Sequence, residues 1–117
     1  IEDKIRTNLE GLIKMTRAAL PLVKDCIINI GSGAGIQGHS PLTTYCATKF
    51  GVRGFTQALA DETPRLRIFA VNPGATATRM TNFRGMSPKT VAQIIVNTVQ
   101  GKYKVPSGGD INVWDVL

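Results

Sequence analysis

The sequence contains few of the residues from which metal sites and disulfide frameworks are built. Its 117 residues include two cysteines and one histidine, and Cys26 and Cys46 lack the spacing of metal ligands. We therefore expect no metal site and two reduced, packed thiols. No apolar run approaches the roughly 18 residues that a membrane-spanning helix needs. On these grounds we expect a soluble, cytoplasmic protein without a membrane partner.

Composition and charge argue against two further classes. Hydrophobic residues make up 43% of the chain and charged residues 19%, which are ordinary values for a globular protein and argue against disorder. The net charge of +6 comes from fourteen scattered Lys and Arg residues without interleaved aromatics, so we expect a solvated basic surface and no nucleic-acid partner. A chain of this length buries one core, which predicts a single domain over residues 1–117.

The first residues carry a helical pattern that starts at once. Apolar residues recur at helical spacing from Ile1 to Val23, and no capping residue precedes them. The first residue is not methionine, and no signal-peptide pattern follows it. We interpret the chain as beginning inside a helix, with its preceding sequence lost, and we expect Pro21 to kink or close that helix.

Strands and helices alternate in the rest of the chain. Short apolar runs that stop at glycine, at Pro-Gly or at the chain end predict strands at residues 26–30, 67–72 and 111–117. Two Ser-Pro pairs, Ser40 with Pro41 and Ser87 with Pro88, fit the N-cap and first position of helices, and these helices should end near Pro64 and Gly101.

This order is typical of an α/β protein with a parallel sheet. With about three strands and three helices, the chain corresponds to the C-terminal half of a Rossmann-like, doubly wound sheet. The first strand of such a half lacks a neighbour on one side, and an unpaired strand edge favours association.

The loop GSGAGIQGH after the first strand allows more than one interpretation. Gly33, Gly35 and Gly38 fit the G-x-G-x-x-G pattern of a phosphate loop, with Asp61 about 20 residues further on. That motif needs a helix to begin within the glycines and an acidic residue at a strand end, whereas Asp61 falls at the expected end of a helix. A tight turn made possible by glycine is the favoured interpretation.

Ser32 in the same loop offers an alternative interpretation as an acyl-transfer nucleophile. The hydrolase elbow G-x-S-x-G needs glycine where Ile30 stands, and His39 would have to be the base because the chain has no other histidine. This interpretation is therefore disfavoured, and His39 is expected to be a surface loop residue.

A tyrosine and a lysine stand four residues apart in the second expected helix. At this spacing Tyr45 and Lys49 share one helix face. A free phenol, with a pKa of about 10, is a poor base at neutral pH, but a nearby ammonium favours the phenolate. Such a pair can exchange a proton with an alcohol or a carbonyl. The spacing alone favours surface packing, because aromatic and lysine residues four apart occur in many helices.

Three ordered motifs carry a resemblance to a known family. IINIGSGAG, then YCATK thirteen residues after Ser32, then VNPGATAT resemble the short-chain dehydrogenase/reductase family, whose pattern is a strand ending in serine, Y-x-x-x-K, and a strand ending in P-G-x-x-x-T. TNLEG also resembles the asparagine-bearing N-x-x-G segment of that family. The resemblance covers nearly the whole chain but only the C-terminal half of a family member. The T-G-x-x-x-G-x-G, ribose-selector and N-N-A-G segments of the N-terminal, dinucleotide-binding half have no counterpart.

The resemblance implies a proton relay of four residues. Tyr45 would be the general acid/base, and Lys49 would lower the pKa of Tyr45 and hold the nicotinamide ribose. Ser32 would hydrogen-bond the substrate oxygen, and Asn8 would hold a water that feeds protons toward Lys49. Hydride transfer to a carbonyl builds charge on oxygen, which a donor at Ser32 and a proton from Tyr45 would stabilise.

The resemblance also implies a cofactor, NAD or NADP, at the strand ends. Pro73 and Gly74 would shape the turn beneath the nicotinamide, and the Thr76 backbone and Thr78 side chain would contact the cofactor, as would Tyr45 and Lys49. The expected function is the interconversion of a small alcohol and a carbonyl, with poor activity in the isolated chain.

The resemblance finally implies association. Family members pair through helices that correspond to residues 6–20 and 44–60, so a homo-oligomer is expected. Small residues at helical spacing, which suggest close approach by another backbone, support this: Ala47, Gly51, Gly54 and Ala58. A non-catalytic oligomerisation or structural module is the alternative function.

Overall fold

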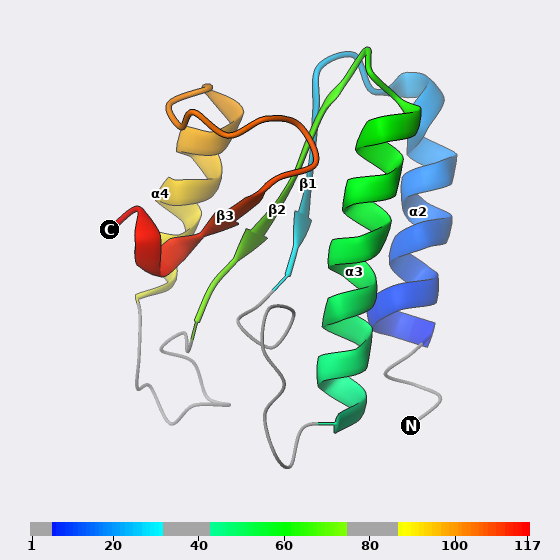
Figure 1. Cartoon of the computed structure of the whole chain (residues 1–117), viewed down its shortest axis with the longest axis horizontal. Coiled ribbons are helices and arrows are strands. Elements are labelled where there is room, and N and C mark those ends of the chain that lie inside the picture. Colours follow the sequence, from blue (N-terminus) through cyan, green and yellow to red (C-terminus); the bar gives the residue numbers. More distant parts are fainter. Residues whose placement is uncertain (1–5, 32–42, 75–86) are drawn as a thin grey trace.

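The computed structural model describes residues 6–31, 43–74 and 87–117, with side chains described from Asn8 in the first range and from Cys46 in the second. Within these residues a parallel sheet in the order β1-β2-β3 lies between helices (Figure 1). The strands are β1 (Cys26–Ile30), β2 (Arg67–Asn72) and β3 (Asp110–Asn112). The α-helices are α2 (Gly11–Ala19), α3 (Thr43–Glu62) and α4 (Pro88–Val99), and the shorter turns are η1 (Arg6–Glu10), η2 (Leu20–Leu22) and η5 (Val113–Asp115).

The arrangement confirms the predicted α/β class, with three strands and three helices. α2 and α3 lie on one side of the sheet and α4 on the other (Figure 1). Both strand pairs are parallel, as alternating strands and helices require. In the described part of the chain no strand pairs with the outer edge of β1, which agrees with the expected open edge. None of the helices in these ranges is long and apolar enough to cross a membrane.

The central strand β2 is covered on both faces. Successive residues of a strand point to opposite sides, so Ile68 packs against Leu59 of α3, while Phe69 and Val71 pack against Ile94 of α4. Ile68 and Val71 are 0% exposed, and burying a side chain of this kind stabilises the fold by about 1.5–3 kcal/mol. Coverage on both faces explains why this strand has a continuous apolar run instead of an alternating pattern.

The ends of α4 agree with the sequence prediction. The Ser87 hydroxyl accepts a hydrogen bond from the Lys89 backbone N–H at 3.3 Å, and Pro88 occupies the first turn. Gly101 follows the helix with φ of 73°, a left-handed conformation that favours glycine. These signals are local in sequence, so they could be interpreted without knowing the fold.

The first helix is less regular than its pattern suggests. It opens with the wide π-turn η1, continues as α2, and ends in the 3-10 turn η2, which contains Pro21. Pro21 thus closes the helix, as predicted. The second helix, α3, ends at Glu62, just before Pro64, whereas its expected N-cap at Ser40 and Pro41 lies outside the described residues.

The last strand is shorter than predicted. The expected strand over residues 111–117 is wrong in extent, because β3 spans Asp110–Asn112 and the chain then enters the 3-10 turn η5. Its partner β2 is followed by Pro73, which has no N–H to continue a ladder. The buried side chain of Val113 and a 3.4 Å hydrogen bond from Asn112 Nδ2 to Asp115 Oδ2 hold the turn instead.

The small residues of α3 do not all serve close packing. A β-carbon on Gly51 would lie 2.9 Å from Leu9 Cδ2, so the close neighbour is a side chain of η1 and not another backbone. Gly54 has open space on the corresponding side, and Ala47 and Ala58 are exposed. Gly51 therefore makes room for a side chain, and within the described residues neither Gly51 nor Gly54 shows the expected close approach by another backbone.

An ion pair ties the amino ends of β1 and β2 to α4. Arg67 Nε and Nη2 donate to the carboxylate of Asp25 at 3.1 and 3.0 Å, and Nη2 also donates to the Val99 carbonyl at 2.9 Å. The hydrogen bond from Arg67 holds the pKa of Asp25 below its usual value. A group whose pKa is lowered by folding adds stability above its unfolded pKa and loses it as the pH falls.

We therefore predict that Asp25→Asn lowers stability at neutral pH but not in strong acid. The difference from the wild type should vanish as the pH falls below about 3.9, the pKa of an unperturbed aspartate, and through the lower folded pKa. Urea midpoints measured across this range provide the test. Glu10→Gln, which removes an exposed i,i+4 pair with Lys14, serves as control. A deficit in Asp25→Asn that is constant with pH would contradict the prediction.

Candidate active site

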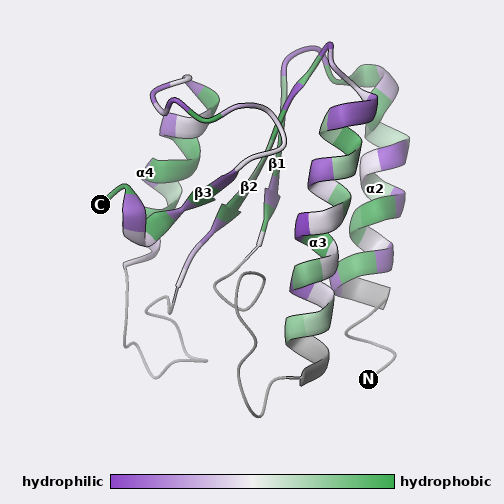
Figure 2. Cartoon of the chain, in the orientation of Figure 1, coloured by the Kyte–Doolittle hydropathy of each residue, from purple (hydrophilic) through white to green (hydrophobic). Residues whose placement is uncertain are grey.

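The carboxyl ends of the three strands meet at one edge of the sheet, where ligands bind in open α/β sheets. Hydrophilic residues interrupt the apolar strands toward these ends (Figure 2). They include Asn29 in β1 and Asn72 in β2, while β3 has Asp110 at its first position and Asn112 at its last. Asn29 and Asn72 are buried, so this edge combines a packed interior with a concentration of hydrogen-bonding groups.

Lys49 reaches the end of β1 from α3. Its ammonium donates a long hydrogen bond, 3.4 Å, to the carbonyl of Ile30, the last residue of β1. The side chain is half-buried, and this burial lowers the pKa of Lys49 from its ordinary value. The ammonium thus contacts Ile30, which precedes Ser32 by two residues in the sequence. Ser32 itself lies outside the described residues.

Two further predicted site residues, Tyr45 and Asn8, belong to two different elements, α3 and η1. Tyr45 lies in α3 one turn before Lys49, so the two residues leave the helix on one face; the Tyr45 side chain lies outside the description. Asn8 is half-buried in the π-turn η1, next to Leu9, which packs on Gly51 two residues beyond Lys49. π-turns are rare and often occur at functional sites.

The P-G turn follows β2 directly at the same edge. Pro73 is half-buried and Gly74 exposed. Trp114, in η5, lies beside this turn, since its Cε3 atom would be 3.9 Å from a β-carbon on Gly74. Of the remaining predicted site residues, Thr76 and Thr78 lie outside the described residues, as do the three loop glycines.

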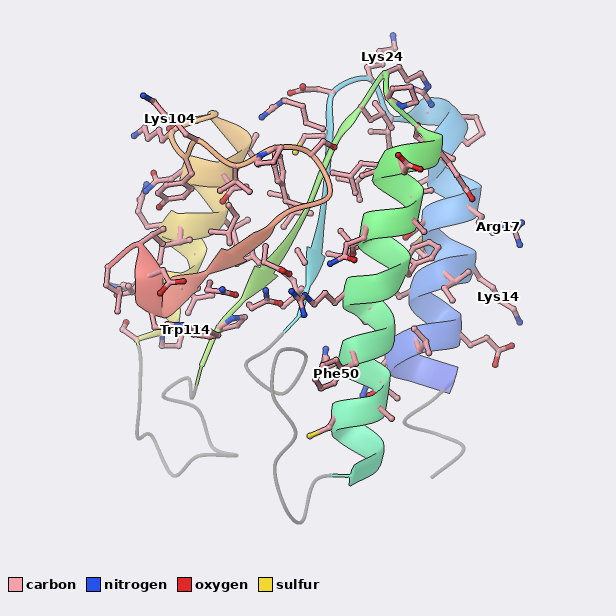
Figure 3. The ribbon with its side chains drawn as sticks, in the orientation of Figure 1. Lys14, Arg17, Lys24, Phe50, Lys104 and Trp114 are labelled. Atoms are coloured by element: carbon pink, nitrogen blue, oxygen red, sulfur yellow. The ribbon has the colours of Figure 1, made fainter. Side chains whose placement is uncertain are left out.

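Two features at this edge were not predicted from the sequence. The first is Trp114, the only tryptophan of the chain, which is 44% exposed. It lies beside β3, and Phe50 lies across the sheet edge on α3 (Figure 3). The one available signal was the replacement of the usual family C-terminus by NVWDVL.

The second unpredicted feature is a polar network between the strands and α3. Asn72 Nδ2 donates to Asp110 Oδ1 at 3.1 Å and to Asn112 Oδ1 at 3.0 Å. Arg53 Nε donates to the other carboxylate oxygen of Asp110 at 2.8 Å. Arg53 comes four residues after Lys49, so the helical spacing of Tyr45 and Lys49 could have pointed to it.

A surface hollow of about 480 Å³ lies at the opposite edge of the sheet. It is bordered by the end of α3 and by residues 106–109, which precede β3. This hollow lies away from Lys49 and from the strand ends, so the carboxyl edge, with its half-buried lysine and polar residues, is the better candidate for chemistry.

Comparison with known proteins defines the class and then the family. The sheet and helices are those of Rossmann-like α/β proteins: the chain superposes on the Escherichia coli oxidoreductase YciK with a TM-score of 0.85 and 26% identity, covering 96% of this chain and 51% of that one. Residues 1–88 match the short chain dehydrogenase family model. The chain belongs to the short-chain dehydrogenase/reductase family of oxidoreductases.

Two named enzymes are similar to this chain over part of their own length. The NADP-dependent 3-hydroxy acid dehydrogenase of Schizosaccharomyces pombe is 33% identical in an alignment that covers 79% of this chain and 44% of that protein. The 3-ketoacyl-(acyl-carrier-protein) reductase of Brucella melitensis, solved in complex with NADH, superposes with a TM-score of 0.84 at 25% identity, covering 93% of this chain and 54% of that one. The chain thus spans about half the length of these relatives.

The lowered pKa of Lys49 predicts a pH dependence of stability. Between its folded pKa and about 10.4, the ordinary value for lysine, the unfolded chain holds a proton that the folded chain has released. Stability therefore rises with pH in this window. Relative to Lys49→Met, wild-type stability should improve as the pH rises from neutral into the alkaline range, as measured by urea unfolding.

A second uncharged variant, Lys49→Gln, provides the control. Its stability difference from the wild type should change with pH in the same direction, because the effect belongs to the ammonium that both variants lack. A difference that is flat with pH in both variants would show that folding leaves the lysine pKa unchanged.

Proposed function

We propose that this chain is the catalytic portion of an NAD- or NADP-dependent oxidoreductase that interconverts an alcohol and a carbonyl compound. Tyr45 acts as general acid/base in this proposal. The observation that carries it is the 3.4 Å contact between Lys49 Nζ and the Ile30 carbonyl, which sets the ammonium at the carboxyl edge of the sheet, one helical turn from Tyr45. Family membership supports the oxidoreductase class.

The described residues suit a nicotinamide cofactor at this edge. Gly74 is exposed beside the strand ends, and the half-buried Lys49 offers N–H donors that would bond a ribose hydroxyl of the bound cofactor. The cofactor supplies or accepts the hydride when bound. Solved relatives occur in complex with NADP, NADPH or NADH, so we propose a nicotinamide cofactor without choosing between the phosphorylated and unphosphorylated forms.

The proton chemistry falls to residues of the chain itself. Tyr45 gives its phenolic proton to the carbonyl oxygen in reduction and takes it back in oxidation. The Lys49 ammonium stabilises the phenolate that results, because an opposite charge nearby favours the charged form. Ser32 holds the substrate oxygen, and Asn8, at the π-turn, holds a water that returns the proton through Lys49. Pro73, Thr76 and Thr78 complete the cofactor contacts.

Association is the second part of the proposal. We infer that residues 1–117 form one partial Rossmann-like domain that pairs through the helices of residues 6–20 and 44–60. The exposed small residues Ala47, Gly54 and Ala58 on α3 favour close packing against another helix. Association without catalysis is the alternative function, and retention of Tyr45 and Lys49 in the Y-x-x-x-K motif makes it the less favoured one. A cytoplasmic location stays a prediction.

Replacement of Tyr45 tests the assigned acid/base. Tyr45→Phe should lower kcat by about 10²- to 10⁴-fold, the usual contribution of a positioned acid/base. Tyr103→Phe is a matched control, because it removes a phenol hydroxyl that is hydrogen-bonded to Asn97 on α4, away from the site. Turnover of ethyl acetoacetate with NADPH or NADH is the measurement. Equal activity of the two variants would refute the assignment of Tyr45.

Trp114 offers a direct test of cofactor binding. It is the only tryptophan, is partly exposed and lies beside Gly74, so a nicotinamide bound at this turn should quench its fluorescence. Titration with NADH and NADPH should give a saturable decrease in the wild type. Trp114→Phe, which has no tryptophan, corrects for the absorbance of the cofactor. If the decrease in fluorescence is explained entirely by absorbance of the cofactor, cofactor binding at Gly74 is contradicted.

A further inference from the structure

We propose that Asn72 is a positioning residue that fixes the end of β1 at Gly31, and thereby the residue that follows, Ser32. This inference rests on the proposed function, in which Ser32 holds the substrate oxygen. Asn72 itself is the last residue of β2 and stands directly before the P-G turn. A single side chain would thus connect the substrate-binding serine to the turn that shapes the cofactor site.

The amide end of Asn72 is fully engaged. Its two N–H groups donate to Asp110 Oδ1 and to Asn112 Oδ1, both on β3, at 3.1 and 3.0 Å. Both acceptors are oxygen atoms, so they determine which end of the carboxamide faces β3. The side chain is 1% exposed, and water is therefore not available as an alternative partner for these donors.

The carbonyl end of Asn72 therefore faces the opposite way, toward β1. A β-carbon built on Gly31 would overlap this carboxamide oxygen, so only glycine fits at position 31 while Asn72 holds this orientation. The Gly31 backbone N–H donates to the Val71 carbonyl at 2.8 Å, which extends the pairing of β1 with β2 by one residue. Gly31 is thus hydrogen-bonded through its backbone and packs closely against the Asn72 side chain.

The same network reaches the helix that carries Tyr45 and Lys49. Asp110 accepts from Asn72 through Oδ1 and from Arg53 of α3 through Oδ2, at 2.8 Å in the second case. Its side chain is 14% exposed, which protects the ion pair from solvent. The carboxylate of Asp110 therefore links Asn72, which packs against the end of β1, to the helix that contains Lys49.

Asn29 is a matched comparison. It is also a buried asparagine, 3% exposed, in the next strand of the same sheet. Its amide donates to Thr56 Oγ1 of α3 at 2.9 Å, and Gly31 is not among its partners. Removal of either carboxamide takes a hydrogen bond from a polar partner, whereas only the Asn72 variant also removes the side chain that packs against Gly31.

The first measurement is amide hydrogen exchange at Gly31 and Ser32 in Asn72→Ala and Asn29→Ala, followed by NMR. We expect faster exchange at these two amides in Asn72→Ala only. Asn72→Ser, which keeps one donor group, provides a milder variant should Asn72→Ala fold poorly, and it should show a smaller change at the same residues. Equal exchange in the Asn72 and Asn29 variants would overturn the inference.

The second measurement is the turnover of ethyl acetoacetate with NADPH or NADH. Asn72→Ala should lower kcat by about 100-fold, the effect of a misplacement of about 1 Å, and change the KM for cofactor little. Asn29→Ala should change kcat by no more than a few-fold. If Asn72→Ala lowers the stability of the protein but leaves kcat unchanged, the positioning role is refuted. A wild type without turnover would count against the proposed function, while hydrogen exchange would still decide whether Asn72 fixes Gly31.

Discussion

The burial of β2 on both faces is the constraint on which the rest of the structure depends. A strand covered on both faces must be apolar where it is covered, as at residues 68–71 of β2, and it must receive a helix on each side. Ile68 faces α3, and Phe69 and Val71 face α4, so one short strand determines where both helices pack. Because β1 and β3 pair with β2 in parallel, their carboxyl ends necessarily meet at the same edge. The location of the candidate site follows from this pairing.

Polar residues within this apolar framework are costly unless they are paired. A buried carboxamide without partners costs about 1–3 kcal/mol, and β1 and β2 each contain one, Asn29 and Asn72. Both are hydrogen-bonded, and both stand toward the carboxyl ends of their strands, where apolar packing gives way to the candidate site. Their placement is consistent with buried polar groups that specify geometry, because hydrogen bonds require defined directions and apolar contacts do not.

Features that depend on neighbouring residues were predicted from the sequence more accurately than features that depend on residues far apart in the chain. The cap of α4 at Ser87 and its end at Gly101 depend on neighbouring residues only, and both agree with the structure. The length of β3 depends on a partner strand that stops before Pro73, which a pattern within residues 111–117 does not contain. The network of Asn72 was likewise beyond the sequence, because its partners lie 38 and 40 residues further along the chain. Glycine at position 51 indicated close packing but not that Leu9 would be the neighbour.

The position of Tyr45 relative to the sheet depends on where α3 lies along its own axis. Three polar side chains on this helix, at intervals of four and three residues, each bond to a different point of the sheet. Lys49 reaches the Ile30 carbonyl, Arg53 reaches Asp110, and Thr56 accepts from Asn29. Apolar contacts alone tolerate repacking, but a helix that slides along its axis would break all three hydrogen bonds together. Because three contacts fix the helix, the loss of one, such as that between Asn29 and Thr56, leaves two that still hold Lys49, and the turn of α3 that contains Tyr45, level with the end of β1.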